Sequence, residues 1–254
     1  MIIWLASYPK SGDELVKTLL SSYVFSEDGS YHPELLNNIK QFPNNELFKQ
    51  LGVDTNNEDA MYKNYISSQK LYFDENSIRF LKTHSCFVSR KDFQFTDKYN
   101  TLGAIYIVRD PRSILSSFSN DLRQTTQQSS ETILTHQYLG KDSPDHCLTN
   151  LGSWKYHYNS WKTFNKFNRY CLIKYEDLIL DTEKVFLEIL KFISRMGKVN
   201  FTVEKEKLKN TFRTCDLSKI KEFEKTQNSS SDKEILDSLE KELQNEMKEL
   251  NYLK

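Results

Sequence analysis

The short segment Tyr8-Pro9-Lys10-Ser11-Gly12 constrains the fold of this chain more than any other feature. It follows Ile2-Ile3-Trp4-Leu5-Ala6, a continuous apolar run typical of a strand buried on both faces. Beyond Gly12, apolar residues recur at helical spacing and predict a helix: Leu15, Leu19, Leu20 and Tyr23. A loop between a strand and a helix N-terminus presents backbone N–H groups and the positive end of the helix dipole. The segment is therefore a candidate anion site, to which Lys10 would add a positive charge.

The rest of the chain alternates predicted strands with predicted helices. Further strands are expected at residues 79–82, 103–108 and 170–174. Helices are expected near 58–73, after Pro111, and over about 149–167. Strands separated by helices predict a parallel sheet. We therefore expect an α/β, P-loop-like fold of three layers, with a central parallel sheet flanked by helices.

The length of 254 residues favours a single domain spanning 1–254. Residues 26–77 are rich in Asn, Asp, Glu and Tyr and indicate a variable region on the substrate side. Near the C-terminus, Ser231 and Glu234 form a capping-box pattern. An amphipathic packing helix is expected behind it, with apolar residues at Ile235, Leu239, Leu243, Met247 and Leu250.

Composition and charge exclude several classes of protein. Lys and Arg number 35 and Asp and Glu also 35, so no global field draws the chain to nucleic acid or an anionic membrane. The cysteines, Cys86, Cys147, Cys171 and Cys215, lie far apart, which argues against a metal or redox site and favours reduced thiols. The N-terminal apolar run is too short for a signal sequence or a membrane span. We expect a cytoplasmic protein with no transmembrane segment; the sequence does not indicate an oligomeric state.

Polar segments lie where three predicted strands end. They are Lys82-Thr83-His84, Arg109-Asp110-Pro111 with Ser117 in the following helix, and Tyr175-Glu176-Asp177-Leu178. A guanidinium can donate two parallel hydrogen bonds to a phosphate, and a neutral imidazole can accept a proton from a hydroxyl. Each segment alone also has an ordinary explanation: Arg109 could pair with Asp110, and a histidine at a strand end is commonly a structural hydrogen bonder.

In their order and spacing, these segments resemble those of the sulfotransferases. The resemblance runs from about residue 2 to residue 196. It includes Gly152-Ser153-Trp154-Lys155-x-His157-x-x-x-Trp161 ahead of the strand at 170–174. Trp154 and Trp161 are seven residues apart on one helical face and are expected in the core.

The resemblance implies 3′-phosphoadenosine 5′-phosphosulfate as co-substrate, no metal, and transfer of a sulfuryl group to a hydroxyl or amine. It implies Lys10, Lys82 and His84 as catalytic residues, with His84 as the base. The implied nucleotide-binding residues are Lys10, Ser11, Gly12, Asp13, Glu14, Arg109, Ser117 and Tyr175. Tyr175 would lie near the adenine, and the Glu176 and Asp177 carboxylates would hold their turn by hydrogen bonds to backbone N–H groups. The acceptor would be a small molecule, carbohydrate or lipid.

The chain departs from the family pattern in two places. After Gly12 the family has Thr or Asn, then Thr and Trp, whereas this chain has Asp13, Glu14 and Leu15. We expect the two carboxylates to intrude on the phosphosulfate site. The family's C-terminal R-K-G-x-x-G-x-W loop has no match between 200 and 254, and Arg213 is not assigned its role.

Two hypotheses therefore remain from different classes of protein. The first is an active sulfotransferase. The second is a non-catalytic relative that binds a nucleotide or partner on the same scaffold. A P-loop nucleotide kinase is disfavoured, because the G-x-x-x-x-G-K-[ST] loop is missing.

Overall fold

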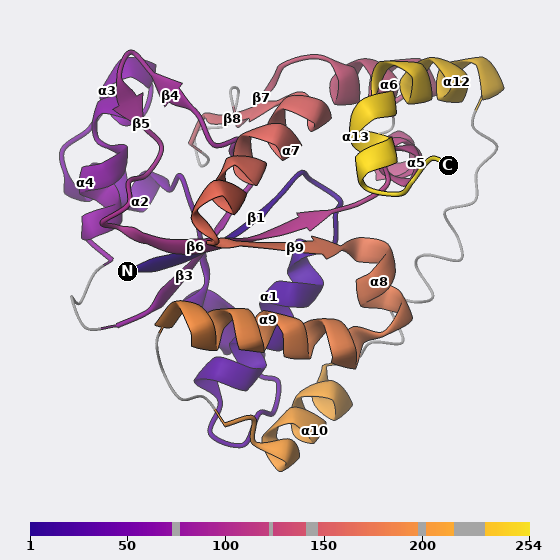
Figure 1. The fold of residues 1–254 in the computed structure, drawn as a ribbon. Helices are drawn as coiled ribbons and strands as arrows, with labels where there is room; N and C mark the ends of the chain where they lie inside the picture. Colours follow the sequence, from indigo (N-terminus) through magenta and orange to yellow (C-terminus); the bar gives the residue numbers. More distant parts are fainter. Residues whose placement is uncertain (73–76, 122–123, 141–146, 198–201, 216–231) are drawn as a thin grey trace.

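A five-stranded sheet lies at the centre of the computed structural model (Figure 1). The structure describes residues 1–254 except 73–76, 122–123, 141–146, 198–201 and 216–231. The strand order is β2-β3-β1-β6-β9, and every neighbouring pair is parallel. The strands are β1 Ile2–Ser7, β2 Lys40–Gln41, β3 Arg79–Thr83, β6 Thr101–Val108 and β9 Tyr170–Lys174. The parallel sheet expected from the alternating pattern is confirmed.

Helices cover both faces of this sheet. One face packs against α1 Asp13–Phe25, α8 Tyr175–Leu180, α9 Thr182–Gly197 and α10 Lys205–Thr214. The other packs against α2 Asn45–Gln50, α3 Glu58–Lys63, α4 Tyr65–Lys70, α5 Pro111–Asp121, α6 Thr126–Leu134, α7 Trp154–Lys162, α12 Lys233–Glu242 and α13 Gln244–Glu249. Strand β1 alternates between these layers, because successive side chains of a strand point to opposite faces. Ile3 and Leu5 enter one core cluster, while Trp4 and Ala6 enter the other.

Short elements complete the chain. They are the 3₁₀ helices η1 Pro33–Asn38 and η2 Thr163–Phe167, the hairpin β4 Ser89–Arg90 with β5 Phe93–Gln94, and the antiparallel pair β7 Gln137–Leu139 with β8 Thr149–Gly152. Trp154 and Trp161 are fully buried, as expected. No helix in the described ranges is long and apolar enough to cross a membrane.

Several expected boundaries were wrong. The helix expected over 149–167 begins at Trp154, because β8 precedes it and the Ser153 side chain caps its N-terminus. The helix expected near 58–73 is interrupted at Asn64. The edge strand β2 was not expected, since its two residues are too few to show a periodicity.

The C-terminal helix also differs from its expected form. Asp232, not Ser231, caps it by accepting a hydrogen bond from the Glu234 N–H. Ser231 lies outside the described residues. The helix breaks at Leu243 into α12 and α13, and both pieces pack on the core by the expected apolar residues.

Candidate functional site

The carboxyl ends of four parallel strands bring the candidate residues together. The register pairs Ala6 with Thr83, Ser7 with Ile107, and Val108 with Lys174. The segments that follow these strands therefore begin at one edge of the sheet. Ligands of parallel α/β sheets bind at this edge.

A pocket of about 370 Å³ opens at this edge. It is lined by Pro9, Lys10, Gly12, Asp13, Glu14, Leu15, Lys82, His84, Arg109, Ser117 and Tyr175. Every site residue expected from the sequence lines the pocket except Ser11. The Ser11 side chain is fully buried, and its hydroxyl makes no hydrogen bond to the part of the chain that the structure describes.

The loop between β1 and α1 is a tight turn that needs glycine. Lys10 and Gly12 both have positive φ, 68° and 92° respectively. A Cβ atom at Gly12 would lie 2.1 Å from a ring carbon of Tyr175, so only glycine fits against that ring. Gly12 is the N-cap of the 13-residue helix α1 and provides no side-chain hydrogen bond to it. Because Gly12, Asp13 and Glu14 line the pocket, the N-terminus of this helix lies at the pocket.

The Lys82 ammonium is held between two carboxylates. Its Nζ lies 2.6 Å from Asp13 Oδ2 and also pairs with Glu14 Oε1. Lys82 and Asp13 are buried, whereas the Glu14 side chain is 66% exposed. Burial alone would raise the pKa of Asp13, but the nearby His84 and Lys82 outweigh it and hold that pKa below its usual range. Burial alone would lower the pKa of Lys82, but the Asp13 and Glu14 carboxylates outweigh it and raise that pKa.

The geometry of His84 leaves one ring nitrogen available as a base. Nδ1 lies 2.8 Å from the Ser7 carbonyl oxygen. A carbonyl can only accept, so Nδ1 carries the proton and Nε2 keeps its lone pair. Nε2 lies 3.7 Å from Asp13 Oδ2, so that carboxylate would stabilise a proton taken up by Nε2.

A second histidine, His157, supports this arrangement. It is fully buried, and burial together with His84 lowers its pKa to about 3, so it is neutral. Its Nε2 lies 3.2 Å from the His84 carbonyl oxygen and donates to it, while Nδ1 accepts from the Tyr106 hydroxyl at 2.8 Å. The segment Gly152–Trp161 contains His157, but the sequence alone predicts no role for this histidine.

Arg109 and Tyr175 line the same pocket and contact each other. An Arg109 N–H donates to the Lys10 carbonyl at 2.9 Å, and the guanidinium lies 4.5 Å from the centre of the Tyr175 ring. The alternative pairing with Asp110 is made by Arg112 instead, at 2.6 Å. Arg112 also binds Glu240 of α12, which makes it a structural residue. Ser117 is buried on the second turn of α5 and lines the same pocket.

The segment after β9 is the first turn of α8, and Glu176 holds a neighbouring segment in place of its own turn, which differs from the expectation. Its carboxylate accepts from the Asp110 N–H at 2.9 Å and from the Tyr252 hydroxyl at 2.8 Å. This carboxylate ties the strand ends of β6 and β9 to the C-terminus.

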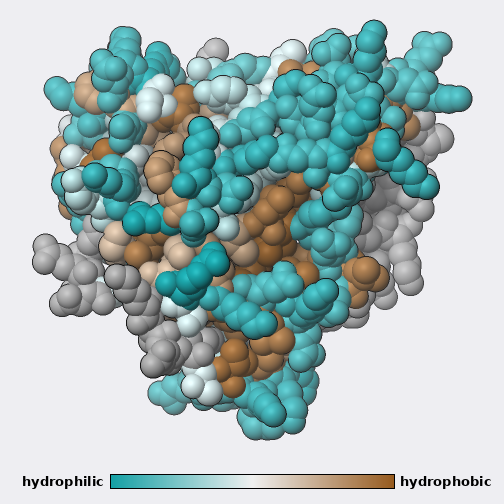
Figure 2. All heavy atoms as spheres, in the orientation of Figure 1, coloured by the Kyte–Doolittle hydropathy of each residue, from teal (hydrophilic) through white to brown (hydrophobic). Residues whose placement is uncertain are grey.

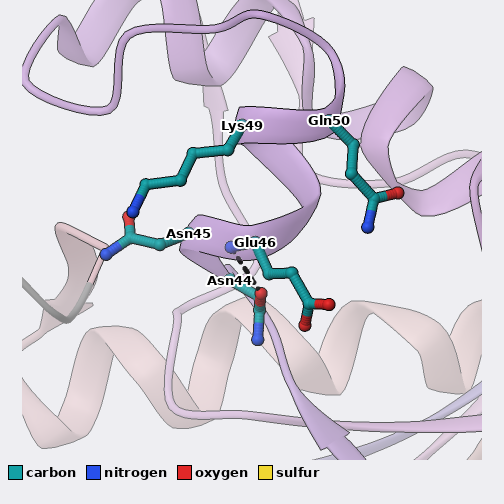
Figure 3. A pocket seen from close by; sticks show the side chains of 5 residues that line it. All are labelled: Asn44, Asn45, Glu46, Lys49 and Gln50. Atoms are coloured by element: carbon teal, nitrogen blue, oxygen red, sulfur yellow. Dashed lines mark hydrogen bonds between the residues drawn. The ribbon is translucent and has the colours of Figure 1, made fainter.

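A larger hollow lies on α2, away from this site (Figure 3). It measures about 610 Å³ and is lined by Asn44, Asn45, Glu46, Lys49 and Gln50. Asn44 caps α2 through the Glu46 N–H at 2.9 Å, and the Lys49 and Asn45 side chains point toward one another. The hollow is lined by one short helix and its cap, and none of the strand-end residues lines it, so volume alone does not make it the functional site.

The described residues contain no cluster of His, Cys, Asp or Glu able to hold a metal ion. The described cysteines form no disulfide bond.

Comparison with known proteins gives the family. Residues 2–249 match the model of the sulfotransferase domain, so the chain belongs to the sulfotransferase family. Among solved structures, retinol dehydratase in a complex with retinol and PAP aligns over 97% of this chain and 81% of its own, at 14% identity and a TM-score of 0.52. Mouse sulfotransferase SULT7A1 complexed with PAP aligns over 91% of this chain and 68% of its own, at 18% identity and a TM-score of 0.47. No curated protein sequence matches. The likeness to retinol dehydratase supports the P-loop-like α/β fold and is too distant to transfer a substrate.

Proposed function

We propose that the pocket binds 3′-phosphoadenosine 5′-phosphosulfate and that the protein transfers its sulfuryl group to an acceptor hydroxyl or amine. One observation carries this proposal: the loop before α1, Lys82, His84, Arg109, Ser117 and Tyr175 line a single pocket. The family, shown over nearly the whole chain, supports sulfuryl transfer in general.

His84 would act as the base. Its Nε2 lone pair takes the proton of the acceptor as the acceptor oxygen or nitrogen forms its bond to sulfur. The bond between sulfur and the phosphate oxygen breaks, and the oxygen keeps the electron pair. Asp13 would stabilise the protonated ring, and His157 holds the His84 backbone in place.

The anionic end of the nucleotide would meet the loop before α1. The α1 N-terminus and Lys10 favour negative charge there, and Lys82 would neutralise charge that develops on the leaving oxygen. Asp13 and Glu14 oppose this binding. Glu14 is the exposed partner of Lys82, so we infer that the nucleotide displaces Glu14 and leaves the buried Asp13 pair in place.

The 3′ end would meet Arg109 and Ser117. A guanidinium and a hydroxyl at the N-terminal part of α5 are suitable donors to a phosphate. Tyr175 lies against both Gly12 and Arg109 and would support the adenosine.

The second candidate function is non-catalytic binding of a nucleotide or partner. The ion pairs of Lys82 favour it, because two carboxylates neutralise a cation that sulfuryl transfer would use. In this reading Arg109 and Ser117 still bind a phosphate, and no transfer occurs.

Calorimetric titration with adenosine 3′,5′-bisphosphate, followed by turnover of the phosphosulfate donor with a panel of hydroxyl and amine acceptors, separates these functions. Binding with turnover supports the sulfotransferase. Binding without turnover on any acceptor supports the non-catalytic relative. Failure to bind at millimolar nucleotide would overturn the sulfotransferase and would leave the second candidate only with the binding of a partner.

A further inference from the structure

Tyr252 lies near the C-terminus and reaches the strand ends that carry the candidate site. Its N–H donates to the Met247 carbonyl at 2.8 Å, so the chain turns back on α13 at this point. Figure 1 shows the end of the chain beside α5. The outer surface over α12 and α13 is mainly hydrophilic (Figure 2), while Leu243, Met247 and Leu250 pack in the core. This packing fixes where the Tyr252 side chain lies.

The Tyr252 side chain contacts the residues on both sides of Tyr175. Its hydroxyl donates to Glu176 Oε2 at 2.8 Å. The centre of its ring lies 4.3 Å from the Lys174 ammonium nitrogen. Burial and the Glu176 charge raise the pKa of the hydroxyl, so it keeps its proton and remains a donor. Tyr175, which lines the pocket at the sheet edge, is thus held through both of its chain neighbours.

Glu176 carries this contact to Arg109. Its Oε1 accepts from the Asp110 N–H at 2.9 Å, and that N–H belongs to the peptide group that joins Arg109 to Asp110. One carboxylate therefore binds the peptide after Arg109 with one oxygen and the Tyr252 hydroxyl with the other. Arg112 binds the Asp110 side chain instead, at 2.6 Å, and does not enter this path.

The Glu176 carboxylate fixes the spacing of two pocket residues. Arg109 and Tyr175 contact each other, with the guanidinium 4.5 Å from the centre of the ring. The carboxylate binds the peptide after Arg109, and Tyr175 directly precedes Glu176 in the chain. Consecutive Cα atoms are about 3.8 Å apart, so a shift of Glu176 would be passed to both residues. A hydrogen bond from a guanidinium to a phosphate weakens steeply as its angle departs from linear, so Arg109 needs a fixed position.

We propose that Tyr252 is a positioning residue that sets the preference of the site for a nucleotide with a 3′-phosphate. The inference rests on the proposed binding of 3′-phosphoadenosine 5′-phosphosulfate. The described lining of the pocket does not include Tyr252, so this residue acts on Arg109 through Glu176. Without the Tyr252 hydroxyl, the Glu176 carboxylate can turn toward water and release the peptide after Arg109. Arg109 then keeps its charge but loses its alignment with the 3′ group.

Tyr252→Phe in the full chain tests this role. The variant keeps the ring beside Lys174 and the backbone carbonyl that accepts from Arg112 at 3.0 Å, so this end of the chain stays in place. Calorimetry measures the dissociation constants of adenosine 3′,5′-bisphosphate and adenosine 5′-monophosphate. We expect the bisphosphate to bind about three- to tenfold more weakly, which is the effect of one lost hydrogen bond, and the monophosphate to bind nearly as in the wild type.

Tyr158→Phe is the matched control. The Tyr158 hydroxyl donates to Glu249 Oε1 at 3.0 Å and joins α7 to α13. The control therefore loses the same kind of bond to the same C-terminal segment, but no chain neighbour of Glu249 lines the pocket. Denaturant unfolding should show similar losses of stability in both variants, and only Tyr252→Phe should change the ratio of the two affinities.

An unchanged ratio in Tyr252→Phe, or an equal fall in the control, would overturn the positioning role while the proposed function stands. A wild type that binds both nucleotides equally would overturn the role as well, because the site would then have no preference to set. A wild type that binds neither nucleotide would overturn the proposed function and this role together.

Discussion

Lys82 and Asp13 form a buried ion pair at 2.6 Å in the centre of the candidate site. The pair joins the end of a central strand to the first turn of the helix after the loop. It lies between the proposed base His84 and the exposed Glu14. The same contact thus stabilises the fold and reduces the positive charge that a phosphosulfate would meet.

Removing both carboxylates should therefore improve nucleotide binding. Two unit charges about 4 Å apart interact by roughly 4 kcal/mol at an effective dielectric near 20. Repulsion from either carboxylate can therefore weaken the binding of an anion markedly. We expect Asp13→Asn with Glu14→Thr to tighten adenosine 3′,5′-bisphosphate at least about tenfold by calorimetry, or about 1.4 kcal/mol. The gain should shrink in high salt. An unchanged dissociation constant at low salt would contradict the proposed repulsion.

Asp13→Asn alone should destabilise the protein at neutral pH. Lys82 then loses its buried partner, and a hydrogen bond between charged groups contributes roughly 1.5 to 3 kcal/mol. Because the folded-state pKa of Asp13 is lowered, its stabilisation is present above the unfolded pKa and is lost as pH falls through the folded pKa. Denaturant unfolding at pH 7 and near pH 3 should show the difference between wild type and variant shrinking in acid. A constant difference would mean that folding does not lower the pKa of Asp13.

His84→Ala should abolish most turnover and leave bisphosphate affinity nearly intact. The ring acts on the acceptor, and loss of a general base lowers rates by on the order of 10²- to 10⁴-fold. Single-turnover rates and calorimetry measure the two effects. His32→Ala is the control, since that histidine is exposed and does not line the pocket. Wild-type turnover in His84→Ala would exclude His84 from the mechanism.

Arg109→Ala should weaken adenosine 3′,5′-bisphosphate more than adenosine 5′-monophosphate. The guanidinium is proposed to bind only the 3′ group, and such a charge-assisted bond contributes roughly 1.5 to 3 kcal/mol. Arg112→Ala should lower stability without distinguishing the nucleotides, because Arg112 binds Asp110 and Glu240. Equal losses for both nucleotides in Arg109→Ala would mean that Arg109 has a structural role, such as its hydrogen bond to the Lys10 carbonyl.

Gly12→Ala should damage the site more than Gly52→Ala. Both glycines have positive φ, so each substitution costs about 1 to 2 kcal/mol of backbone strain. Only at Gly12 does the added Cβ collide with the Tyr175 ring. We expect a larger loss of unfolding free energy and of bisphosphate affinity for Gly12→Ala. Indistinguishable variants would show that Tyr175 moves aside freely.

The sequence by itself determined the layers of the fold and the edge of the sheet that carries the site. The apolar run of β1 and the helical spacing after Gly12 depend on local periodicity, which a single chain displays directly. Local periodicity also predicts where β3, β6 and β9 end. In a parallel sheet these ends lie at the same edge, which brings His84, Arg109 and Tyr175 close together. The family resemblance added candidate roles for them.

The tertiary structure alone decided what each charge contacts. Lys82 and Glu14 are 68 residues apart, and no local pattern shows that they pair. Arg112 pairs with Asp110 two residues away, and the packing of α12 brings Glu240 to the same guanidinium. The support of His84 by His157 likewise depends on α7 packing across the sheet. Such contacts follow from three-dimensional packing and burial, which also shift the pKa of Asp13 and His157, and periodicity carries no information about them.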